Sequence, residues 1–350
     1  MSSIATNVQE NPPVVLANLL AILAERRPMA EDLMRAAMRE MMAGAWDEGQ
    51  IASFLSELRK KGETGEEIAA AASILRENMV RLDTGPVKAL DTCGTGGDGL
   101  GTFNISTAAA LVAAGAGVPV VKHGNRASTG RTGSADVLAA LGLEVDSDST
   151  FAKRCLEQSG FAFCFAPRFH PAMRHVVSAR RRLGFRTLFN CLGPLANPAG
   201  ACYQLIGVGH LDWLDPMADA VNRLGTRRAL LVYGRDGMDE VSLAAPTSVR
   251  EVQNGQVASW EWTASDFGLA PCSLEELKSE GARESADRIL AILHGEDSPA
   301  ARVVLANASA ALLAAGRAET PVQGVDLARD AIKTGKAHRV LERLLACSKK

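Results

Sequence analysis

The chain has 350 residues, of which 47% are hydrophobic and 22% charged, and its formal net charge is -2 at pH 7. This composition is typical of a globular protein with one or two domains, and the charge gives no electrostatic reason to bind nucleic acid or an anionic membrane. Seven scattered cysteines without a C-x-x-C pair indicate neither a disulfide framework nor a zinc site. No leader pattern and no run of 18 apolar residues occurs, so we expect a cytoplasmic protein.

The N-terminal region predicts a small bundle of helices. Apolar side chains recur at helical spacing through residues 14–83. Gly44 ends one predicted helix and Asp47 caps the next, while Thr64 and Glu67 have the spacing of a capping box. A Gly-Pro pair then marks a hinge into the rest of the chain.

The segment after the hinge predicts a strand–loop–helix–strand unit. Apolar runs at 89–93 and 118–121 each lead into a loop rich in glycine, hydroxyl and amide side chains. The Ala-rich segment Ser106–Gly115 between them is long enough for a helix, with Asn104 or Ser106 as its N-cap. Two strands joined in this way should be parallel, with a right-handed crossover.

The first of the two loops has the composition of a phosphate site. Its glycines permit positive φ and a close approach of backbone to ligand, and hydroxyls follow at the helix N-terminus. The spacing also satisfies G-x-G-x-x-G, but a dinucleotide site needs an acidic residue after the next strand, which instead ends in Lys122-His123. No Lys-Ser/Thr follows, so the Walker pattern is absent. The glycines are Gly94, Gly96, Gly97 and Gly99.

Further strands and helices alternate along the chain. Ser147 or Ser149 is expected to cap a helix, and His170–Leu183 is predicted as one basic helix. Asn254-Gly255 lies at the centre of a predicted hairpin. The predicted strands are Phe161–Ala166, Tyr203–Val208, Arg228–Tyr233 and the two arms of Val249–Trp262; the later helices are Pro216–Leu224, Leu274–Ser279, Ala286–His294, Ala300–Ala315, Val325–Thr334 and His338–Ala346.

Two motifs together resemble a known family. Gly-Thr-Gly-Gly-Asp-Gly-x-x-Thr-Phe-Asn-Ile-Ser-Thr, from Gly94, followed by Lys-His-Gly-Asn-Arg, from Lys122, closely resembles the anthranilate phosphoribosyltransferases. The likeness covers roughly residues 20–345 and implies a small all-helical domain plus a larger α/β domain with a central mostly parallel sheet. The implied boundaries are 1–85 for the helical domain, with about 170–196 returning to it, and 86–169 with 197–350 for the α/β domain.

The resemblance also implies the substrate contacts. The residues implied to bind phosphoribosyl diphosphate are Gly94, Gly97, Asp98, Thr102, Asn104, Ile105, Ser106, Thr107, Lys122, His123, Gly124, Asn125, Arg126, Ala127, Ser128, Thr129, Gly130 and Ser134. Those implied for anthranilate are Gly94, Asn125 and Arg180, whose guanidinium would face the anthranilate carboxylate with a geometry that lysine lacks.

Two adjacent carboxylates follow a predicted strand of the α/β domain. Asp239 and Glu240 lie near the carboxyl end of that strand, where open α/β sheets bind their ligands. A helix cap or a solvated pair is the alternative, but beside a phosphate loop these carboxylates favour magnesium, which prefers carboxylates, waters and ligand phosphates. The resemblance implies Ser106, Asp239 and Glu240 as the metal contacts, with two magnesium ions.

The implied reaction transfers phosphoribosyl to the amine of anthranilate and releases diphosphate, as a step of tryptophan biosynthesis. The amine is neutral at pH 7, so no strong general base is required, and His123 is expected to position rather than to take a proton. The alternatives are a pyrimidine-nucleoside phosphorylase-like enzyme, which shares the architecture, and a non-catalytic relative that binds nucleic acid. We expect a homodimer that binds neither nucleic acid nor membrane.

Overall fold

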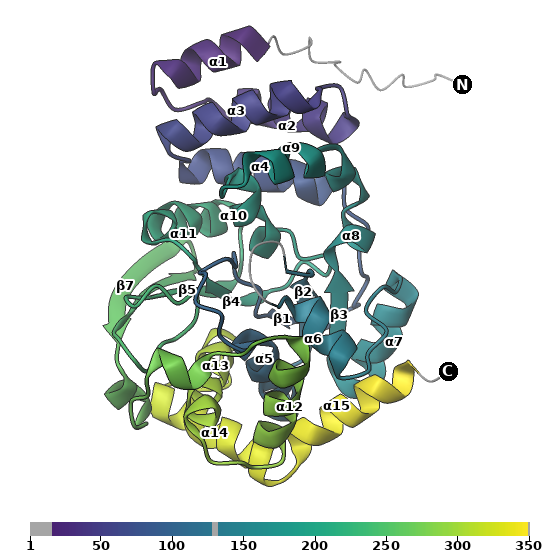
Figure 1. The fold of residues 1–350 in the computed structure, drawn as a ribbon, viewed down its shortest axis with the longest axis vertical. Helices are drawn as coiled ribbons and strands as arrows, with labels where there is room; N and C mark the ends of the chain where they lie inside the picture. The colour runs from purple at the N-terminus through teal and green to yellow at the C-terminus, as the bar shows by residue number, and fades with distance from the viewer. Residues whose placement is uncertain (1–15, 128–131, 349–350) are drawn as a thin grey trace, which may run out of the picture.

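A bundle of helices stands beside a seven-stranded sheet that carries helices on both faces (Figure 1). The structure is a computed structural model that describes residues 16–127 and 132–348, so the predicted contacts Ser128, Thr129 and Gly130 lie outside the described residues. Over those two ranges, no helix is both long and apolar enough to cross a membrane.

The elements follow the chain in this order. The helical bundle contains α1 (Leu16–Ala24), α2 (Glu31–Ala43), α3 (Glu48–Lys61) and α4 (Gly65–Glu77). The strands are β1 (Leu90–Asp91), β2 (Val120–Gly124), β3 (Phe161–Phe165), β4 (Tyr203–Gly207), β5 (Arg228–Gly234), β6 (Thr247–Gln253) and β7 (Gln256–Trp262). The other helices are α5 (Ile105–Gly115), α6 (Ser134–Ala140), α7 (Ser149–Ser159), α8 (Ala166–Phe169), η1 (Pro171–His175), α9 (Val177–Leu183), α10 (Leu188–Leu195), η2 (Leu211–Trp213), α11 (Leu214–Arg223), η3 (Ala264–Phe267), η4 (Leu274–Leu277), α12 (Ala282–Leu293), α13 (Pro299–Ala314), α14 (Pro321–Lys333) and α15 (Lys336–Cys347).

The sheet confirms the predicted fold class. Its strand order is β3-β2-β1-β4-β5-β6-β7, and the pairs from β3 to β5 are parallel. The hairpin β6–β7 adds two antiparallel strands, with Asn254 at φ 52° and Gly255 at φ 79°, the positive values that a two-residue hairpin turn requires. The chain order reverses between β1 and β4, so the carboxyl ends of these strands mark the crevice where such sheets bind ligands.

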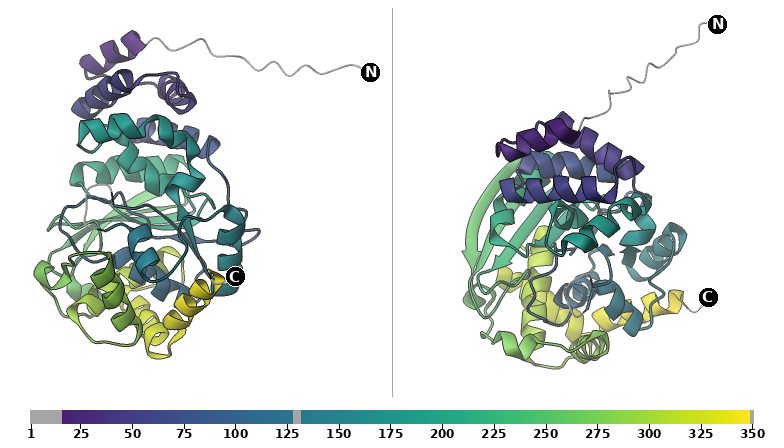
Figure 2. Two further views of the ribbon diagram at one scale, coloured as in Figure 1. Left: turned by 45° about the vertical axis from the view of Figure 1, so that its right-hand side comes forward. Right: turned by 45° about the horizontal axis from the view of Figure 1, so that its top comes forward.

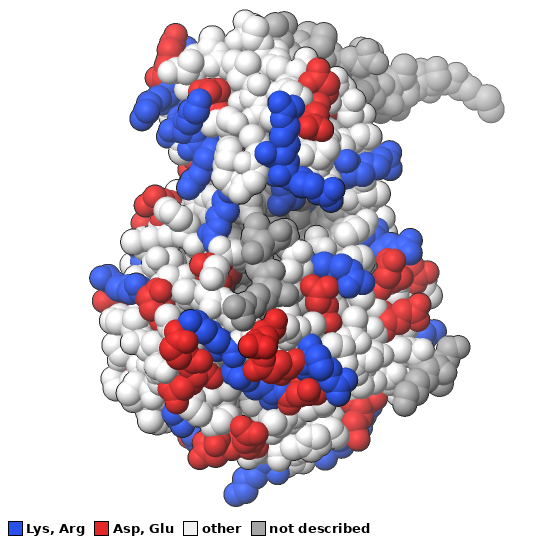
Figure 3. Space-filling view, in the orientation of Figure 1, with Lys and Arg blue, Asp and Glu red and all other residues white. Residues whose placement is uncertain are grey.

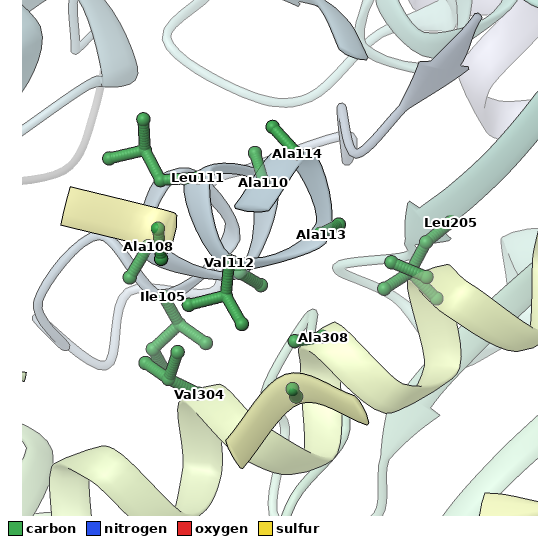
Figure 4. Packing of buried hydrophobic residues seen from close by; sticks show 14 of the residues in the cluster. Ile105, Ala108, Ala110, Leu111, Val112, Ala113, Ala114, Leu205, Val304 and Ala308 are labelled. Atoms are coloured by element: carbon green, nitrogen blue, oxygen red, sulfur yellow. The ribbon is translucent and has the colours of Figure 1, made fainter. Parts of the chain in front are cut away.

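The larger core lies around α5, which is apolar on all sides from Ala108 to Ala114. Ile105 and Val112 of this helix point toward Val304 and Ala308 of α13, and Leu205 of β4 belongs to the same cluster (Figure 4). Small side chains let the helices approach closely: a Cβ at Gly115 would lie 2.6 Å from the Cα of Ala337 in α15. This burial holds the N-terminus of α5 against the ends of the strands.

The second core joins the helical bundle to the opposite face of the sheet. Residues of α1–α4 share one apolar cluster with α10, α11 and inward-facing residues of β4 and β5 (Figure 2). Gly65 at the start of α4 is close to α11, because a Cβ there would lie 2.2 Å from Asp219 Oδ2. Val176 and Leu188, from the segment that the sequence expects to return to the bundle, are fully buried in this cluster. The exact domain boundaries stay a prediction.

Several local predictions differ from the structure. The basic segment is not one helix, because η1 and α9 are separated at Val176. His175 of η1 packs against Gly44: a Cβ on Gly44 would lie 2.6 Å from His175 Nδ1. Asp148, rather than Ser147 or Ser149, caps α7 by accepting from Phe151 N. Its carboxylate is a stronger acceptor than a hydroxyl at a positive helix end.

Candidate functional site

Loops from three neighbouring strands touch at the reversal point of the sheet. The loop after β1, 92–104, is called the glycine loop, and the loop after β4, 208–213, is called the β4–η2 loop. Thr95 N donates to Gly207 O at 2.8 Å, and Gly209 N donates to Thr95 Oγ1 at 2.8 Å. A Cβ at Gly207 would lie 1.7 Å from the carbonyl oxygen of Asp239, so the loop after β5 is packed against the same point.

The glycine loop has the backbone that its composition predicts, with one exception. Gly96, Gly97 and Gly99 have φ values of 68°, 75° and 78°, in the left-handed region that side chains with a Cβ avoid. Gly94 does not take positive φ. It is required for space instead, because a Cβ there would lie 2.8 Å from Gly207 O.

The start of α5 lies directly behind this loop. Asn104 is the N-cap but makes no side-chain bond to the helix backbone; its Oδ1 accepts from the Thr107 hydroxyl. Lys122 is buried, and its Nζ donates to Thr92 O at 3.1 Å and to Ser106 Oγ at 3.2 Å. The structure therefore brings a buried cation and the predicted Ser106 together beneath the loop. Ile105 points into the core, and Thr102 forms an isolated bridge with Lys278.

Three carboxylates gather at the loops after β1 and β5. Burial and the neighbouring carboxylate of Asp98 raise the pKa of Asp239 to about 7. Burial and Asp239 together raise the pKa of Glu240 well above its usual range, although Lys122 and a hydrogen bond from the Ser106 backbone act in the opposite direction. Crowded carboxylates that raise one another's pKa favour binding of a cation.

The donor set fits magnesium bound together with a substrate. Within residues 16–127 and 132–348, no group of three or more His, Cys, Asp and Glu side chains forms a metal site by itself. Magnesium is usually held by one or two carboxylates plus waters and substrate phosphates, so a complete protein cage is not required. Asp239, Glu240 and the Ser106 hydroxyl are the oxygen atoms available for this purpose, with Asp98 beside them.

The loop after β2, of which the structure describes 125–127 and 132–133, is called the second loop, and Asp136 at the start of α6 contacts both described parts. Asp136 accepts from Ala127 N and from Gly133 N at 3.0 Å each, and from Arg126 NH1 at 3.0 Å. Asn125 is exposed, and its Oδ1 accepts from Arg126 N. Gly124 and Ser134 are in contact, because a Cβ at Gly124 would lie 2.1 Å from Ser134 Oγ. Asp136 thereby fixes the described ends of this loop.

His123 is buried at the end of β2 and pairs with a second histidine. Its Nδ1 lies 2.9 Å from Gly193 O, which accepts a hydrogen bond when the ring carries its proton on Nδ1, and its ring centroid lies 4.9 Å from that of His170. Burial lowers the pKa of His123 to about 4. Burial and the neighbouring His123 lower the pKa of His170 to about 3. Both rings are thus neutral at pH 7, and the positioning role of His123 stays a prediction.

We expect His170→Gln to reduce the acid sensitivity of the fold. Between the folded pKa of about 3 and the ordinary value of about 6.5, the unfolded chain binds one more proton at this histidine. Wild-type stability therefore falls by about 1.4 kcal/mol for each pH unit below 6.5 through this group alone. Urea unfolding at pH 6, 5 and 4 measures the free energy of unfolding of both proteins. The value for wild type minus that for the variant should decrease by about this amount for each pH unit. A difference independent of pH would mean that His170 is not held neutral.

Arg180 lies in the last turn of α9, at the edge of the helical bundle. Its guanidinium carbon lies 5.6 Å from the centroid of the Phe189 ring, and burial lowers its pKa. No ion pair to a carboxylate is found for it among the described residues. By contrast, the nearby Arg182 lies 3.6 Å from Glu48. A half-buried arginine without an acidic partner is available to bind an anionic ligand.

Arg186 also reaches the site, although the sequence analysis gave it no role. It lies between α9 and α10, and its NH1 donates to Gly209 O at 2.5 Å. A Cβ at Gly209 would lie 2.7 Å from this NH1 and 2.7 Å from Gly96 O, so the guanidinium is beside the glycine loop. Its charge opposes the rise in the pKa of Asp239 that burial and Asp98 cause.

The comparisons with known proteins agree with this geometry. Residues 86–338 match the family model described as "Glycosyl transferase family, a/b domain", and residues 17–79 match "Glycosyl transferase family, helical bundle domain". An anthranilate phosphoribosyltransferase of Symbiobacterium thermophilum is 47% identical over 326 residues, which cover 93% of this chain and 96% of that protein.

Two solved structures are similar over almost the whole chain. The anthranilate phosphoribosyltransferase of Thermus thermophilus has a TM-score of 0.89 and 42% identity, covering 95% of this chain and 99% of its own. The Saccharomyces cerevisiae enzyme in complex with PRPP and Mg has a TM-score of 0.88 and 28% identity, covering 95% of this chain and 98% of its own. The chain therefore belongs to the anthranilate phosphoribosyltransferase family.

Proposed function

We propose that the chain transfers the phosphoribosyl group of 5-phosphoribosyl 1-diphosphate (PRPP) to the amine of anthranilate, in tryptophan biosynthesis. The products are N-(5-phosphoribosyl)anthranilate and diphosphate. The observation that carries this proposal is the meeting of the glycine loop, the N-terminus of α5 and the Asp98, Asp239 and Glu240 carboxylates at the reversal point of the sheet. This arrangement suits a magnesium-bound diphosphate.

Each part of the site has a distinct task in this reaction. The amine nitrogen forms a bond to the anomeric carbon, the bond from that carbon to the diphosphate oxygen breaks with its electron pair, and the amine proton passes to solvent. Backbone N–H groups of the glycine loop and the α5 N-terminus stabilise the charge that grows on the leaving oxygens. Asp239, Glu240 and Ser106 would hold magnesium, which supplies further positive charge to the diphosphate.

The residues implied for PRPP can be assigned to two sides of the substrate. We propose that Gly94, Gly97, Asp98 and Asn104 contact the diphosphate side, and that Asn125 with the second loop contacts the ribose phosphate. Lys122 is buried and already bonded to Thr92 and Ser106, so its contribution is a fixed positive charge behind the site. A fixed charge in a site of low dielectric stabilises an anion without needing to reorganise.

Arg180→Ala should raise KM for anthranilate about tenfold or more while changing KM for PRPP little. A charged hydrogen bond to a carboxylate contributes about 1.5–3 kcal/mol, and no acidic side chain in the described residues competes for this guanidinium. Steady-state kinetics with each substrate varied in turn measure the two constants. The exposed neighbour Arg181→Ala is the matched control. Equal increases in both KM values would remove Arg180 from the acceptor site.

The surface is compatible with two anionic substrates. On the face shown in Figure 3, Lys and Arg gather along the border of the helical part, whereas both signs of charge alternate over the lower part. Such a distribution attracts small anions to the border of the helical part. It offers nucleic acid no extended basic stripe on this face. By resemblance we further propose two magnesium ions, a homodimer and a cytoplasmic location; light scattering of the purified protein tests the dimer.

One pair of assays separates this function from its enzymatic rival. Diphosphate release from PRPP should require anthranilate and magnesium, and phosphorolysis of thymidine or uridine by inorganic phosphate should be absent. Nucleoside phosphorolysis without anthranilate-dependent release of diphosphate would instead assign the chain to the pyrimidine-nucleoside phosphorylase reaction.

A further inference from the structure

The position of the glycine loop depends on the β4–η2 loop. Thr95 is held between the end of β4 and this loop: its N–H donates to the carbonyl oxygen of Gly207, the last residue of β4, and its hydroxyl accepts from Gly209 N, each at 2.8 Å. Gly94 and Gly209 have no room for a Cβ at this contact. A shift of the β4–η2 loop would therefore move the start of the glycine loop with it.

The far end of the β4–η2 loop is anchored in the helical bundle. Trp213 is 1% exposed, and its Nε1 donates to Glu63 Oε2 at 3.2 Å, across 150 residues of sequence. Glu63 lies in the turn between α3 and α4. Arg59 of α3 completes the anchor: its NH1 lies 3.5 Å from the same Oε2, and its guanidinium carbon lies 5.0 Å from the Trp213 ring centroid.

The contact of Arg59, Glu63 and Trp213, called the anchor, contains a buried carboxylate that packing alone does not require. The Glu63 side chain is fully buried, and its second oxygen, Oε1, has no hydrogen-bond partner among the described residues. Replacing a buried ion pair with apolar side chains of similar volume is often neutral or stabilising, so packing alone does not require a carboxylate at this position. The carboxylate instead fixes the orientation of two side chains, because the same oxygen accepts from the indole N–H of Trp213 and from the guanidinium of Arg59.

The path from this anchor to the site is short. Trp213 N donates to His210 O at 3.0 Å, and the two rings are 6.2 Å apart between centroids. Gly209 precedes His210 and bonds to Thr95. We propose that Arg59, Glu63 and Trp213 are positioning residues, which hold the glycine loop in its phosphate-binding shape from the helical bundle. The inference rests on the proposed function, in which the glycine loop binds PRPP.

The first test separates a positioning role from a merely structural one. Trp213→Phe keeps a buried aromatic ring, of smaller size, and removes the N–H donor, and Arg59→Met keeps an apolar stem but removes the charge. Both should raise KM for PRPP about five- to tenfold while KM for anthranilate stays within about twofold. Arg59→Lys, which keeps the charge, should recover part of the loss. Arg35→Met is the matched control, because Arg35 is a half-buried arginine of the same bundle, bonded to Ser73 away from Trp213.

A second test does not depend on catalysis. Hydrogen exchange of the backbone amides at 94–101 in the ligand-free protein should be faster in Trp213→Phe and Arg59→Met than in wild type and Arg35→Met. Unchanged exchange with an unchanged ratio of KM values would overturn the inference even in an active enzyme. If wild type transfers nothing to anthranilate, the proposed function fails and hydrogen exchange alone decides the positioning role. If Arg35→Met changed hydrogen exchange and KM by the same amounts, the effects would reflect the general stability of the bundle. That result would also overturn the inference.

Discussion

The double variant Asp239→Asn, Glu240→Gln is expected to lose about 10²- to 10³-fold in turnover, the size of effect seen when one electrostatic contact is removed from an active site. The amides keep the shape of the side chains and remove two negative charges. In the proposed site these charges hold magnesium against the diphosphate, where charge grows as the bond breaks, so kcat falls more than PRPP affinity. Steady-state kinetics over a magnesium titration measure both quantities.

Magnesium dependence distinguishes this explanation from loss of folding. A weakened metal site fills by mass action, so raised magnesium should recover part of the activity of the double variant. Asp326→Asn is the control, because Asp326 is an exposed carboxylate of α14, with 67% of its side chain accessible. Full turnover of the double variant at low magnesium would show that these carboxylates are solvated only, and Asp98 would become the candidate ligand.

Gly96→Val should abolish PRPP binding while the protein stays folded. Gly96 has φ 68° and no atom within 4 Å of the place where a Cβ would lie, so the valine fills open space at the site rather than the core. A β-branched residue resists this φ, and its methyl groups would occupy the volume that the phosphates need. Isothermal titration calorimetry with PRPP and magnesium measures the loss.

A second glycine provides a matched control for backbone strain. Gly225 has φ 72° and also has no atom within 4 Å of the place where its Cβ would lie, but it is in the turn between α11 and β5. Gly225→Val should carry a similar conformational cost, lower the melting temperature and leave PRPP affinity unchanged. If both variants bind PRPP as wild type does, Gly96 is not at the ligand.

Local chemistry explains which parts of the fold were predictable. The Asn254-Gly255 turn and the Thr64–Glu67 capping box are decided by residues within a few positions of each other, and both occur as predicted. The glycine loop was recognised for the same reason, because its φ values follow from its own sequence. Element ends were less well predicted where a neighbouring residue competed, as Asp148 did with Ser147 and Ser149.

The missed parts of the site depend on contacts between distant segments. Arg186 reaches Gly209, and Glu63 reaches Trp213, only because the helical bundle packs on one face of the sheet. Asp136 has the sequence pattern of a helix start, but its role comes from three donors on the preceding loop. No periodicity or spacing in one sequence reports such pairs, because each partner alone has an ordinary surface or capping pattern.

The decay of anthranilate fluorescence tests the central claim most directly. With purified protein, PRPP and magnesium, the signal should fall, and one diphosphate should be released for each anthranilate consumed. Omitting PRPP or chelating the magnesium should stop the decay. A constant signal in the complete mixture, from protein shown by circular dichroism to be folded, would contradict the assignment of this site to phosphoribosyl transfer.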